Sequence, residues 1–379
     1  MKKLLALILT LACVSILSAC QLGGIGDGKT HVKFYHTMGS NLRTVLDKYI
    51  AEFNKTNPTI SIDHEQVGSY DDVRDQITTE LQAGKQPAIA YCYPDHVASY
   101  LRSKKVIDLN TYIHSADPTV ALTQAQIDDF IDGYYAEGTQ FGDETKMYSL
   151  PFSKSTEVLY YNKTFFDENE LTVPTTWDQM EELCAKIKKI DPNSVPLGYD
   201  SEANWFITMT EQLKTPYTSA GTDHYLWDTA ENKAFITRFT EWYTKGYLTT
   251  QKLYGGYTSG LFVNQEADKD GKIIRSYMSI GSSAGAPHQA PDKTDAGTYP
   301  FETGIAPIPQ IDAENNPKVI SQGPSLCLFD QKDDAVEAAA WQFVKFLLTS
   351  ADFQAEFSMA SGYVPVLESV LENPAYQTF

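Results

Sequence analysis

Two short glycine-bearing stretches match patterns that carry chemistry in enzymes. The first, GGIGDGKT over residues 23–30, fits G-x-x-x-x-G-K-[ST], the loop that cradles nucleotide phosphates on backbone N–H groups. Such a loop must follow a buried strand and open a helix. Here it follows an apolar N-terminal segment and precedes the strand-like run 31–36. The sequence therefore predicts a flexible tether at this place rather than a nucleotide site.

The second stretch, GSSAG over residues 281–285, fits G-x-S-x-G, the nucleophile elbow of serine hydrolases, and follows a strand-like run at 273–280. In that fold the triad runs Ser, then Asp or Glu, then His. The one histidine after Ser283 is His288, and no carboxylate lies between them. The stretch is therefore predicted to be a small-residue turn at a strand end, with a surface hydrolase using Ser283 as a remote alternative.

Other catalytic and metal patterns are weak. The seven histidines show no metal-ligand spacing such as H-E-x-x-H, so neither a metal nor a cofactor is expected. The paired carboxylates of a glycosidase meet only in three dimensions, so spacing leaves that alternative open.

The N-terminus predicts export. Lys2 and Lys3 precede an apolar run at 4–17, and the end of that run reads L-S-A-C at 17–20. This order is typical of a secretory signal peptide over residues 1–19. It resembles the bacterial lipobox, which implies lipidation of Cys20 and a tether over 20–29. We therefore expect the protein on the extracellular face of the cytoplasmic membrane, held there by lipid.

Composition narrows the class of protein. The 379 residues carry a net charge of −19, and such an acidic surface disfavours nucleic acid as a partner. Hydrophobic residues make up 42%, enough for a large core, and the length predicts two domains or one large bilobed domain. Cys92, Cys184 and Cys327 are widely separated, and we expect them to be buried free thiols.

Strand-like and helix-like segments alternate along the chain, which favours an α/β fold with helices on both faces of a mostly parallel sheet. Expected strands include 32–35, 60–62, 87–92 and 158–161; expected helices include 42–53, 73–81, 95–103, 177–187 and 333–348. Gly84 is predicted to cap one helix and Thr175 to begin another.

Eight landmarks in order resemble one known family, the extracellular solute-binding proteins of ABC importers, in its carbohydrate-binding group. They are YIAEFNK at 49–55, GKQPAI at 84–89, YSLPF at 148–152, LYYNK at 159–163, PTTW at 174–177, GIAPIP at 304–309, AWQFVKFL at 340–347 and SGYVPV at 361–366.

The resemblance implies a two-lobed, type II periplasmic-binding-protein-like fold with a ligand cleft between lobes joined by hinge strands. Lobe 1 would be residues 30–150 plus 322–362, and lobe 2 residues 151–321 plus 363–379. It also implies a monomer without catalytic residues that closes about its hinge and delivers its ligand to ABC permease subunits.

Within the family the chain is most similar to the glycerol-phosphate-binding branch. The segment YHTM at 35–38 resembles the start of that branch. Matching positions imply ligand contacts, to which His36 is added because it follows the first strand: His36, Tyr70, Asp95, Ser155, Trp205, Ser282, Ser283, Gly323 and Tyr363.

The chain also departs from that branch. Glu202 stands where the branch has a tryptophan, and the chain ends at Phe379, before the branch's further helices and cleft arginine, so we expect a short C-terminus. Lys154 is the one obvious cation near the implied site. A carbohydrate is therefore the expected ligand, and glycerol phosphate or a glycerophosphodiester the alternative. A surface interaction protein without a small ligand is a further alternative.

Overall fold

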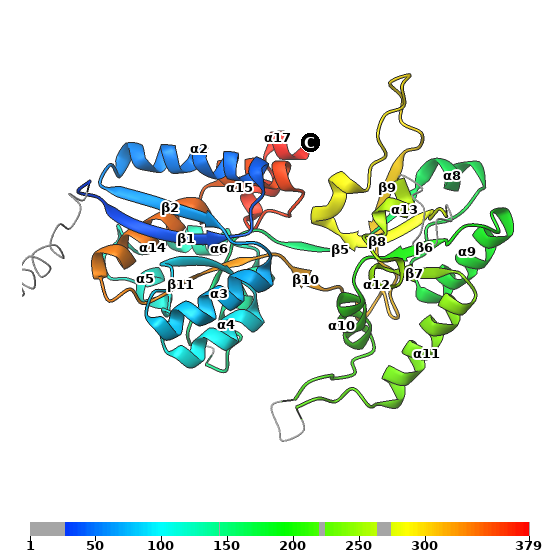
Figure 1. Ribbon diagram of the computed structural model, residues 1–379, viewed down its shortest axis with the longest axis horizontal. Helices are drawn as coiled ribbons and strands as arrows, with labels where there is room; N and C mark the ends of the chain where they lie inside the picture. Colours follow the sequence, from blue (N-terminus) through cyan, green and yellow to red (C-terminus); the bar gives the residue numbers. More distant parts are fainter. Residues whose placement is uncertain (1–26, 144, 220–223, 264–273, 379) are drawn as a thin grey trace, which may run out of the picture. The chain divides into compact units, whose positions relative to one another are not determined.

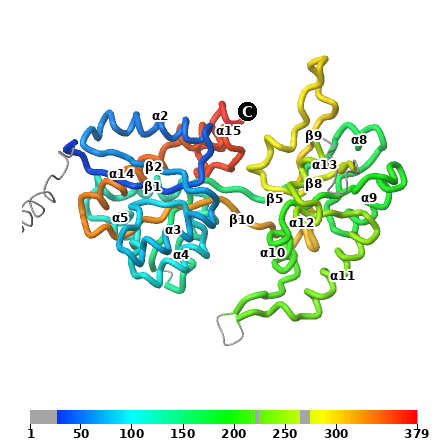
Figure 2. Tube along the Cα trace, in the orientation of Figure 1, coloured from blue at the N-terminus to red at the C-terminus, as the bar shows by residue number. Residues whose placement is uncertain are grey.

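The computed structural model describes residues 27–143, 145–219, 224–263 and 274–378, which form two compact units (Figures 1 and 2). Unit 1 holds the described residues up to Asp128 together with Tyr135–Leu150 and Ser325–Phe353. Unit 2 holds Asp129–Tyr134, Pro151–Pro324 and the described residues from Gln354 onward. Relative to the expected lobes, residues 129–134, 322–324 and 354–362 group with unit 2. The expected signal peptide and Cys20 lie outside the described residues.

The sheet of unit 1 has the strand order β2-β1-β3-β11-β4. Strand β1 pairs in parallel with β2 and β3, whereas β11 runs antiparallel to β3. The strands are β1 (Thr30–His36), β2 (Ile60–Gln66), β3 (Ile89–Cys92), β4 (Leu150–Pro151) and β11 (Ser325–Leu328).

Helices cover both faces of this sheet. Figure 1 shows α2 on one face, with α3 and α4 on the other, and α14 packs against α2 and β1. The helices of this part of the chain are α2 (Ser40–Thr56), α3 (Tyr70–Ala83), α4 (Pro94–Tyr100), α5 (Asn110–Ile113), α6 (Gln124–Asp128), α7 (Asp132–Ala136) and α14 (Asp334–Leu348).

Local sequence signals set the ends of these elements. Ser69 caps α3 in a reciprocal capping box with Asp72, and Gly84 ends the helix with φ 69°, a conformation that glycine adopts without strain. The buried face of α3 is Val73, Ile77 and Leu81, as the spacing predicted. Thr30 opens strand β1 rather than a helix, so the phosphate-loop pattern lacks its required context.

The sheet of unit 2 has the order β10-β5-β8-β6-β7, with β9 paired to β5. Strand β6 is parallel to β7 and β8, and β5 is antiparallel to β8, β9 and β10. The strands are β5 (Ser155–Asn162), β6 (Leu197–Tyr199), β7 (Leu248–Thr250), β8 (Met278–Ser282), β9 (Thr303–Pro307) and β10 (Ser321–Gln322). The strand predicted at 273–280 is observed as β8, which begins and ends later in the chain than predicted.

Helices α9 and α11 bury their apolar faces in the core of this unit. The predicted face of α9, from Trp177 to Ile187, is buried, but its N-cap is Thr176 rather than Thr175, because the Thr176 side chain accepts the Gln179 N–H. The helices are α8 (Lys163–Glu168), α9 (Trp177–Ile190), α10 (Glu202–Gln212), α11 (Ala230–Thr244), α12 (Gln251–Tyr254), α13 (Ser259–Val263), α15 (Ala351–Ser361), α16 (Glu368–Leu371) and α17 (Pro374–Gln377).

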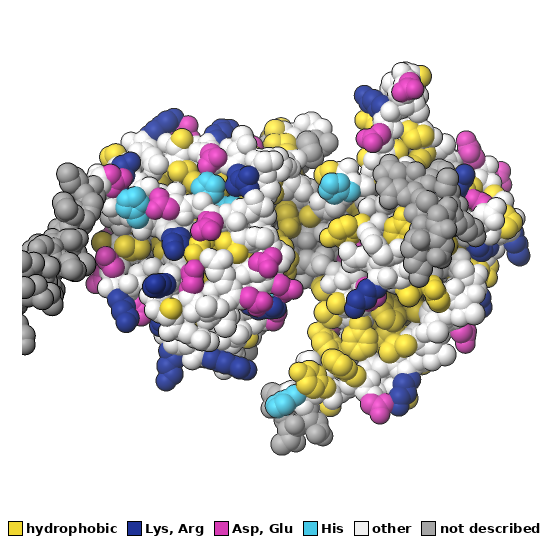
Figure 3. Space-filling view, in the orientation of Figure 1, with side chains coloured by type: hydrophobic (Ala, Val, Ile, Leu, Met, Phe, Trp, Pro, Cys, Tyr) yellow, Lys and Arg dark blue, Asp and Glu magenta, His cyan; other side chains and the backbone are white. Residues whose placement is uncertain are grey.

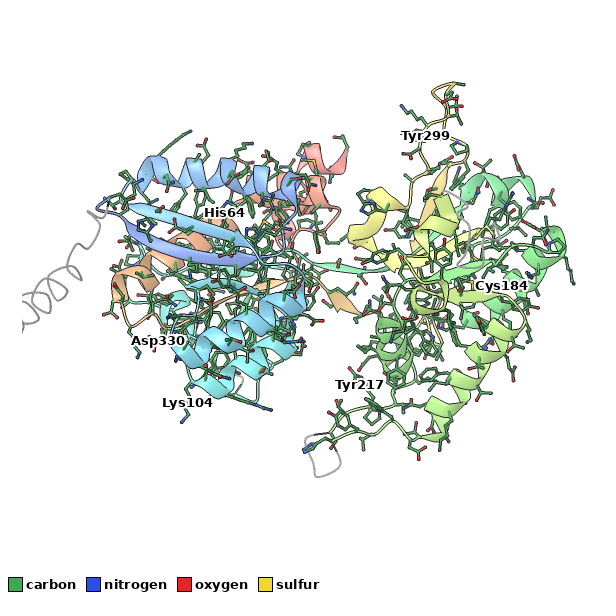
Figure 4. All side chains as sticks on the ribbon, in the orientation of Figure 1. His64, Lys104, Cys184, Tyr217, Tyr299 and Asp330 are labelled. Carbon is green, nitrogen blue, oxygen red and sulfur yellow. The ribbon has the colours of Figure 1, made fainter. Side chains whose placement is uncertain are left out.

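Hydrophobic side chains also gather on one outer face of unit 2, around α10 and α11 (Figure 3). Tyr225 and Trp227 are exposed, and the Trp227 ring contacts those of Tyr225 and of Phe206 on α10. The three predicted free thiols are confirmed as buried, and Cys184 is labelled in Figure 4. None of the described helices combines the length and apolar character that crossing a membrane requires.

Candidate functional site

Polar side chains converge at one edge of the unit 2 sheet. Because β6, β7 and β8 run parallel, their carboxyl ends share that edge, which places Asp200, Gln251 and Ser282 along it. Strand β5 runs the opposite way and begins at the same edge, where Glu157 pairs with Ser282 in the ladder. Segments more than a hundred residues apart thus deliver their polar residues to one place.

A cavity of about 910 Å³ opens at this edge, and all of its lining residues belong to unit 2. Its wall is rich in carboxylate, amide and hydroxyl groups, and no Lys or Arg is among the lining residues. Its lining includes Glu157, Asp200, Asn204, Ser282, Gln322 and Tyr363.

Glu157 is the most buried charged group of this wall, with 2% of its surface exposed. The Tyr199 hydroxyl donates a hydrogen bond of 2.6 Å to its Oε2. Its Oε1 is buried and has no hydrogen-bond partner among the described residues. Burial raises the pKa of Glu157 to about 7, with a smaller raising effect from the Asp200 charge; the Tyr199 hydroxyl and the nearby Asn204 amide oppose this.

Among the described residues, the Asp200 carboxylate is hydrogen-bonded through Oδ1. Its Oδ1 accepts hydrogen bonds from the Thr258 backbone N–H at 2.6 Å and the Thr258 hydroxyl at 2.7 Å. Burial raises its pKa, while both Thr258 bonds act to lower it. A Cβ at Gly281 would lie 2.7 Å from Asp200 Oδ2, so a glycine is needed where β8 passes this carboxylate.

The predicted contacts in unit 2 fall into two groups. Ser282 and Tyr363 line the cavity. Ser283, Ser155, Gly323 and Trp205 are not among its lining residues.

Each residue of the second group has a local environment of its own. Ser283 Oγ accepts the Thr156 N–H, and Ser155 is buried in β5. Gly323 has φ 93°, and a Cβ there would overlap the Ser153 backbone. The Trp205 ring packs on Phe235 and Phe239 in the hydrophobic core.

The three predicted contacts in unit 1 lie at or just beyond the carboxyl ends of β1, β2 and β3, as parallel strands require. Tyr70 opens α3, and its ring meets that of Tyr93 edge-on at 4.8 Å. Asp95 lies in the first turn of α4 with its side chain 75% exposed. His36 ends β1 and is completely buried.

His36 belongs to a chain of hydrogen bonds. The Met38 N–H donates to His36 Nδ1 at 3.1 Å, so the proton of the neutral ring is on Nε2. That N–H donates to His64 Nδ1 at 2.9 Å, and His64 Nε2 in turn donates to Asp47 at 2.9 Å. His64, labelled in Figure 4, lies on β2 beneath α2. Burial, together with repulsion from His64 when that ring is protonated and from Arg43, lowers the pKa of His36 to about 3.

Glu157, Asp200 and Asn204 were not predicted from the sequence. The signal for Glu157 was present, since two-residue alternation in β5 places it on the same face as buried Leu159. Asp200 directly follows the strand 197–199, which was not singled out.

The hydrolase geometry does not form at the GSSAG stretch. A 3₁₀ turn, Ser283–His288, follows β8 in place of the helix of a nucleophile elbow. Within the described residues, Ser283 Oγ is not bonded to a histidine, and no group of three His, Cys, Asp or Glu side chains could hold a metal ion.

Two α/β units, one of them with a polar cavity at the sheet edge, are the features of a small-molecule binding protein. The chain belongs to the family of bacterial extracellular solute-binding proteins, whose family model matches residues 48–378. This confirms the predicted family, whose members are substrate-binding proteins rather than enzymes.

Individual relatives of this chain are also solute-binding proteins. The sn-glycerol-3-phosphate-binding periplasmic protein UgpB of Escherichia coli K12 is 25% identical over 379 residues, covering 96% of this chain and 81% of the relative. The GacH receptor of Streptomyces glaucescens, solved unliganded and with acarbose, has a TM-score of 0.71 at 16% identity, covering 93% of this chain and 84% of its own. UgpB of Mycobacterium tuberculosis in complex with glycerophosphocholine has a TM-score of 0.71 at 18% identity, covering 93% and 82%. These likenesses confirm the two-lobed fold class.

Proposed function

We propose that this protein captures a carbohydrate outside the cell and delivers it to the permease subunits of an ABC transporter. The observation that carries the ligand class is the unit 2 cavity, whose lining includes two carboxylates at the sheet edge and no Lys or Arg. Sugars present many hydroxyl donors and no charge, which suits a wall of carboxylate, amide and hydroxyl acceptors.

Several cavity residues have the chemistry to hold a sugar. Asp200, Asn204 and Ser282 offer hydrogen-bonding groups to hydroxyls, and the rings of Tyr257 and Tyr363 can cover the apolar face of a pyranose. The other predicted contacts, His36, Tyr70, Asp95, Ser155, Trp205, Ser283 and Gly323, remain proposals to be tested individually.

A glycerol phosphate or glycerophosphodiester is the second candidate ligand, because two of the similar proteins are named for or bound to such molecules. An anionic ligand requires cationic or N–H partners. Lys154, the expected cation, is 1% exposed, and its Nζ donates to the Gly323 carbonyl at 3.3 Å. The cavity chemistry therefore favours the sugar.

The same proposal includes where the protein is held, its oligomeric state and its lack of catalysis. Residues 1–19 would be removed as a signal peptide, and lipid on Cys20 would hold a monomeric protein at the extracellular face of the cytoplasmic membrane. The protein would make and break no bond in its ligand, so it would not be an enzyme.

Thermal unfolding against a ligand panel tests this function. The panel holds maltose, maltotriose, raffinose, polyols, glycerol 3-phosphate and glycerophosphocholine. A ligand that binds only the folded state stabilises it by about 2.7 kcal/mol at a hundredfold excess over Kd. A sugar that raises Tm by several degrees and is recovered unchanged supports the proposal. A shift with phosphates alone supports the second candidate, turnover of the sugar supports a hydrolase, and no shift with any compound contradicts both ligand assignments.

A further inference from the structure

The free oxygen of Glu157 is an unusual feature of the cavity wall. A carboxylate oxygen that is buried without a partner costs far more than one that is hydrogen-bonded. Here the cost is relieved only on Oε2, by the Tyr199 hydroxyl at 2.6 Å. Oε1 belongs to a side chain that lines the cavity and is left without a partner among the described residues.

Tyr199 fixes the orientation of this carboxyl. The tyrosine is 1% exposed, and its pKa is raised well above 10, first by burial and then by the Glu157 charge. Its hydroxyl therefore stays protonated and donates a hydrogen bond to Oε2. Oε1 is then the buried oxygen of this cavity-lining side chain that is left to accept a further hydrogen bond. A ligand hydroxyl donating to it would supply the missing hydrogen bond and would favour the charged form of the carboxyl.

We propose that Glu157 is a specificity-determining residue whose Oε1 accepts a hydrogen bond from a ligand hydroxyl, so that ligand binding releases a proton from Glu157. This inference rests on the proposed function, since it assigns a role within the same cavity. Glu157 would select ligands that bring a hydrogen-bond donor to Oε1 and would disfavour a phosphate placed against its carboxylate.

The groups around Glu157 reinforce this role. The Asp200 carboxyl at the end of β6 disfavours a second negative charge, and the Tyr199 hydroxyl and the Asn204 amide of α10 favour it. The other titratable groups of the cavity lining are His288 of the 3₁₀ turn, Asp292, Tyr257 and Tyr363. With no Lys or Arg among the lining residues, a ligand hydroxyl is the donor that can be added to the Tyr199 hydroxyl and the Asn204 amide.

The coupling has a defined sign. In the free protein the pKa of Glu157 is raised to about 7, so at pH 6 the group is mostly protonated. A ligand that needs the carboxylate must then displace the proton, and its affinity falls by up to about tenfold per pH unit below pH 7. Above about pH 8 the carboxylate is already formed, and the affinity becomes independent of this group.

Isothermal titration tests the proposal. The panel sugar with the largest Tm shift is titrated into purified wild-type protein from pH 5.5 to 8.5, in two buffers with different ionisation enthalpies. We expect affinity to rise with pH up to about 7.5, and close to one proton to be released per ligand at pH 6. Glu157→Gln should weaken binding at pH 8 by roughly tenfold or more and abolish the proton release.

Glu241→Gln on α11, which changes an exposed carboxylate of the same unit in the same way, is the matched control and should behave as wild type. If Glu157→Gln does not fold, the proton release of the wild-type protein decides. Sugar binding that is independent of pH and releases no proton overturns this inference and leaves the proposed function standing. Failure of every panel compound to bind overturns the proposed function and this inference with it.

Discussion

Both units of this protein bury a titratable side chain near a strand end, such as His36 in unit 1 and Glu157 in unit 2, but these two are satisfied differently. His36 has hydrogen-bond partners for both ring nitrogens within its own unit. Glu157, which lines a cavity, has a partner for one carboxyl oxygen and none among the described residues for the other. A buried polar group whose partners are complete stabilises the fold, whereas one left incomplete at a cavity wall indicates a place for a ligand.

Neighbouring strands explain the difference. Strand β1 lies beside β2 in parallel, and the ring of His64 on β2 stacks on that of His36 with centroids 5.1 Å apart. In unit 2, the residue opposite Glu157 in the ladder is Ser282, whose Oγ accepts the Ala284 N–H in the turn that follows β8. The same type of position is thus closed by a side chain in one unit and left open in the other.

Removing His36 should have the largest effect on stability. His36→Ala leaves the Met38 N–H and His64 Nδ1 without their partner and opens a cavity, so we expect a loss of about 3–5 kcal/mol in the free energy of unfolding. Urea unfolding measures it. His31→Ala on the same strand removes a half-exposed histidine and should change stability little. An equal effect of the two substitutions would contradict the role given to His36. Sugar affinity measured on folded His36→Ala tests separately whether His36 contacts the ligand.

The two groups should also give the units opposite pH responses. The pKa of His36 is lowered from 6.5 to about 3, so its contribution to stability is present above 6.5 and is lost as the pH falls towards 3. The pKa of Glu157 is raised from 4.5 to about 7, so its contribution is present below 4.5 and is lost as the pH rises towards 7. Each slope is at most about 1.4 kcal/mol per pH unit.

Hydrogen exchange read separately on peptides of each unit checks this pair of slopes. We expect unit 1 to lose protection towards acid and unit 2 to lose it from pH 5 to 7. Glu157→Gln should flatten the unit 2 slope alone. Parallel pH profiles for the two units in the wild-type protein would show that these two groups do not control their stabilities.

Gly281→Ala should disturb the open site with a smaller effect. The new Cβ would lie 2.7 Å from Asp200 Oδ2 and 3.4 Å from Gln289 Nε2, so the carboxylate must shift against its two bonds to Thr258. We expect a loss of about 1–3 kcal/mol in stability, measured by urea unfolding, together with weaker sugar binding. Gly285→Ala is the stability control, because nothing lies within 4 Å of its Cβ position. If Gly281→Ala were as stable as that control, Asp200 would not be fixed as described.

Local patterns in the sequence were enough to predict much of the fold. The spacing of Val73, Ile77 and Leu81 with Gly84 predicted helix α3 and its left-handed end, because both depend on residues close together in the chain. The strand expected at 273–280 is observed as Met278–Ser282, since a strand-like run in the sequence does not mark where pairing begins. The N-cap of α9 is Thr176, one residue later than predicted, because adjacent threonines offer the same side-chain acceptor.

The cavity was harder to predict than the fold. Ser282 was selected from its glycine-flanked turn, but Glu157 and Asp200 join it only through the antiparallel register of β5 with β8 and the parallel register of β6 with β8. Those pairings link segments far apart in the chain, and no local pattern specifies them. Likewise, the sequence suggested His36 as a binding residue, but could not show that His64 lies within hydrogen-bond distance of it.

The smallest expected effect lies at the outer end of the histidine chain. Asp47 accepts from His64 at 2.9 Å, but its side chain is 64% exposed, so water can replace it as an acceptor. We expect Asp47→Ala to lower the free energy of unfolding by less than about 1 kcal/mol, measured by urea unfolding at pH 7.5. Asp71→Ala on α3 is the comparison, because it removes the exposed partner of Arg74 in another surface ion pair. It should lower the free energy of unfolding about as little. A loss at Asp47 as large as that at His36 would mean that the carboxylate compensates a charged histidine pair, and unit 1 would then hold a buried charge that needs its partner, as unit 2 does.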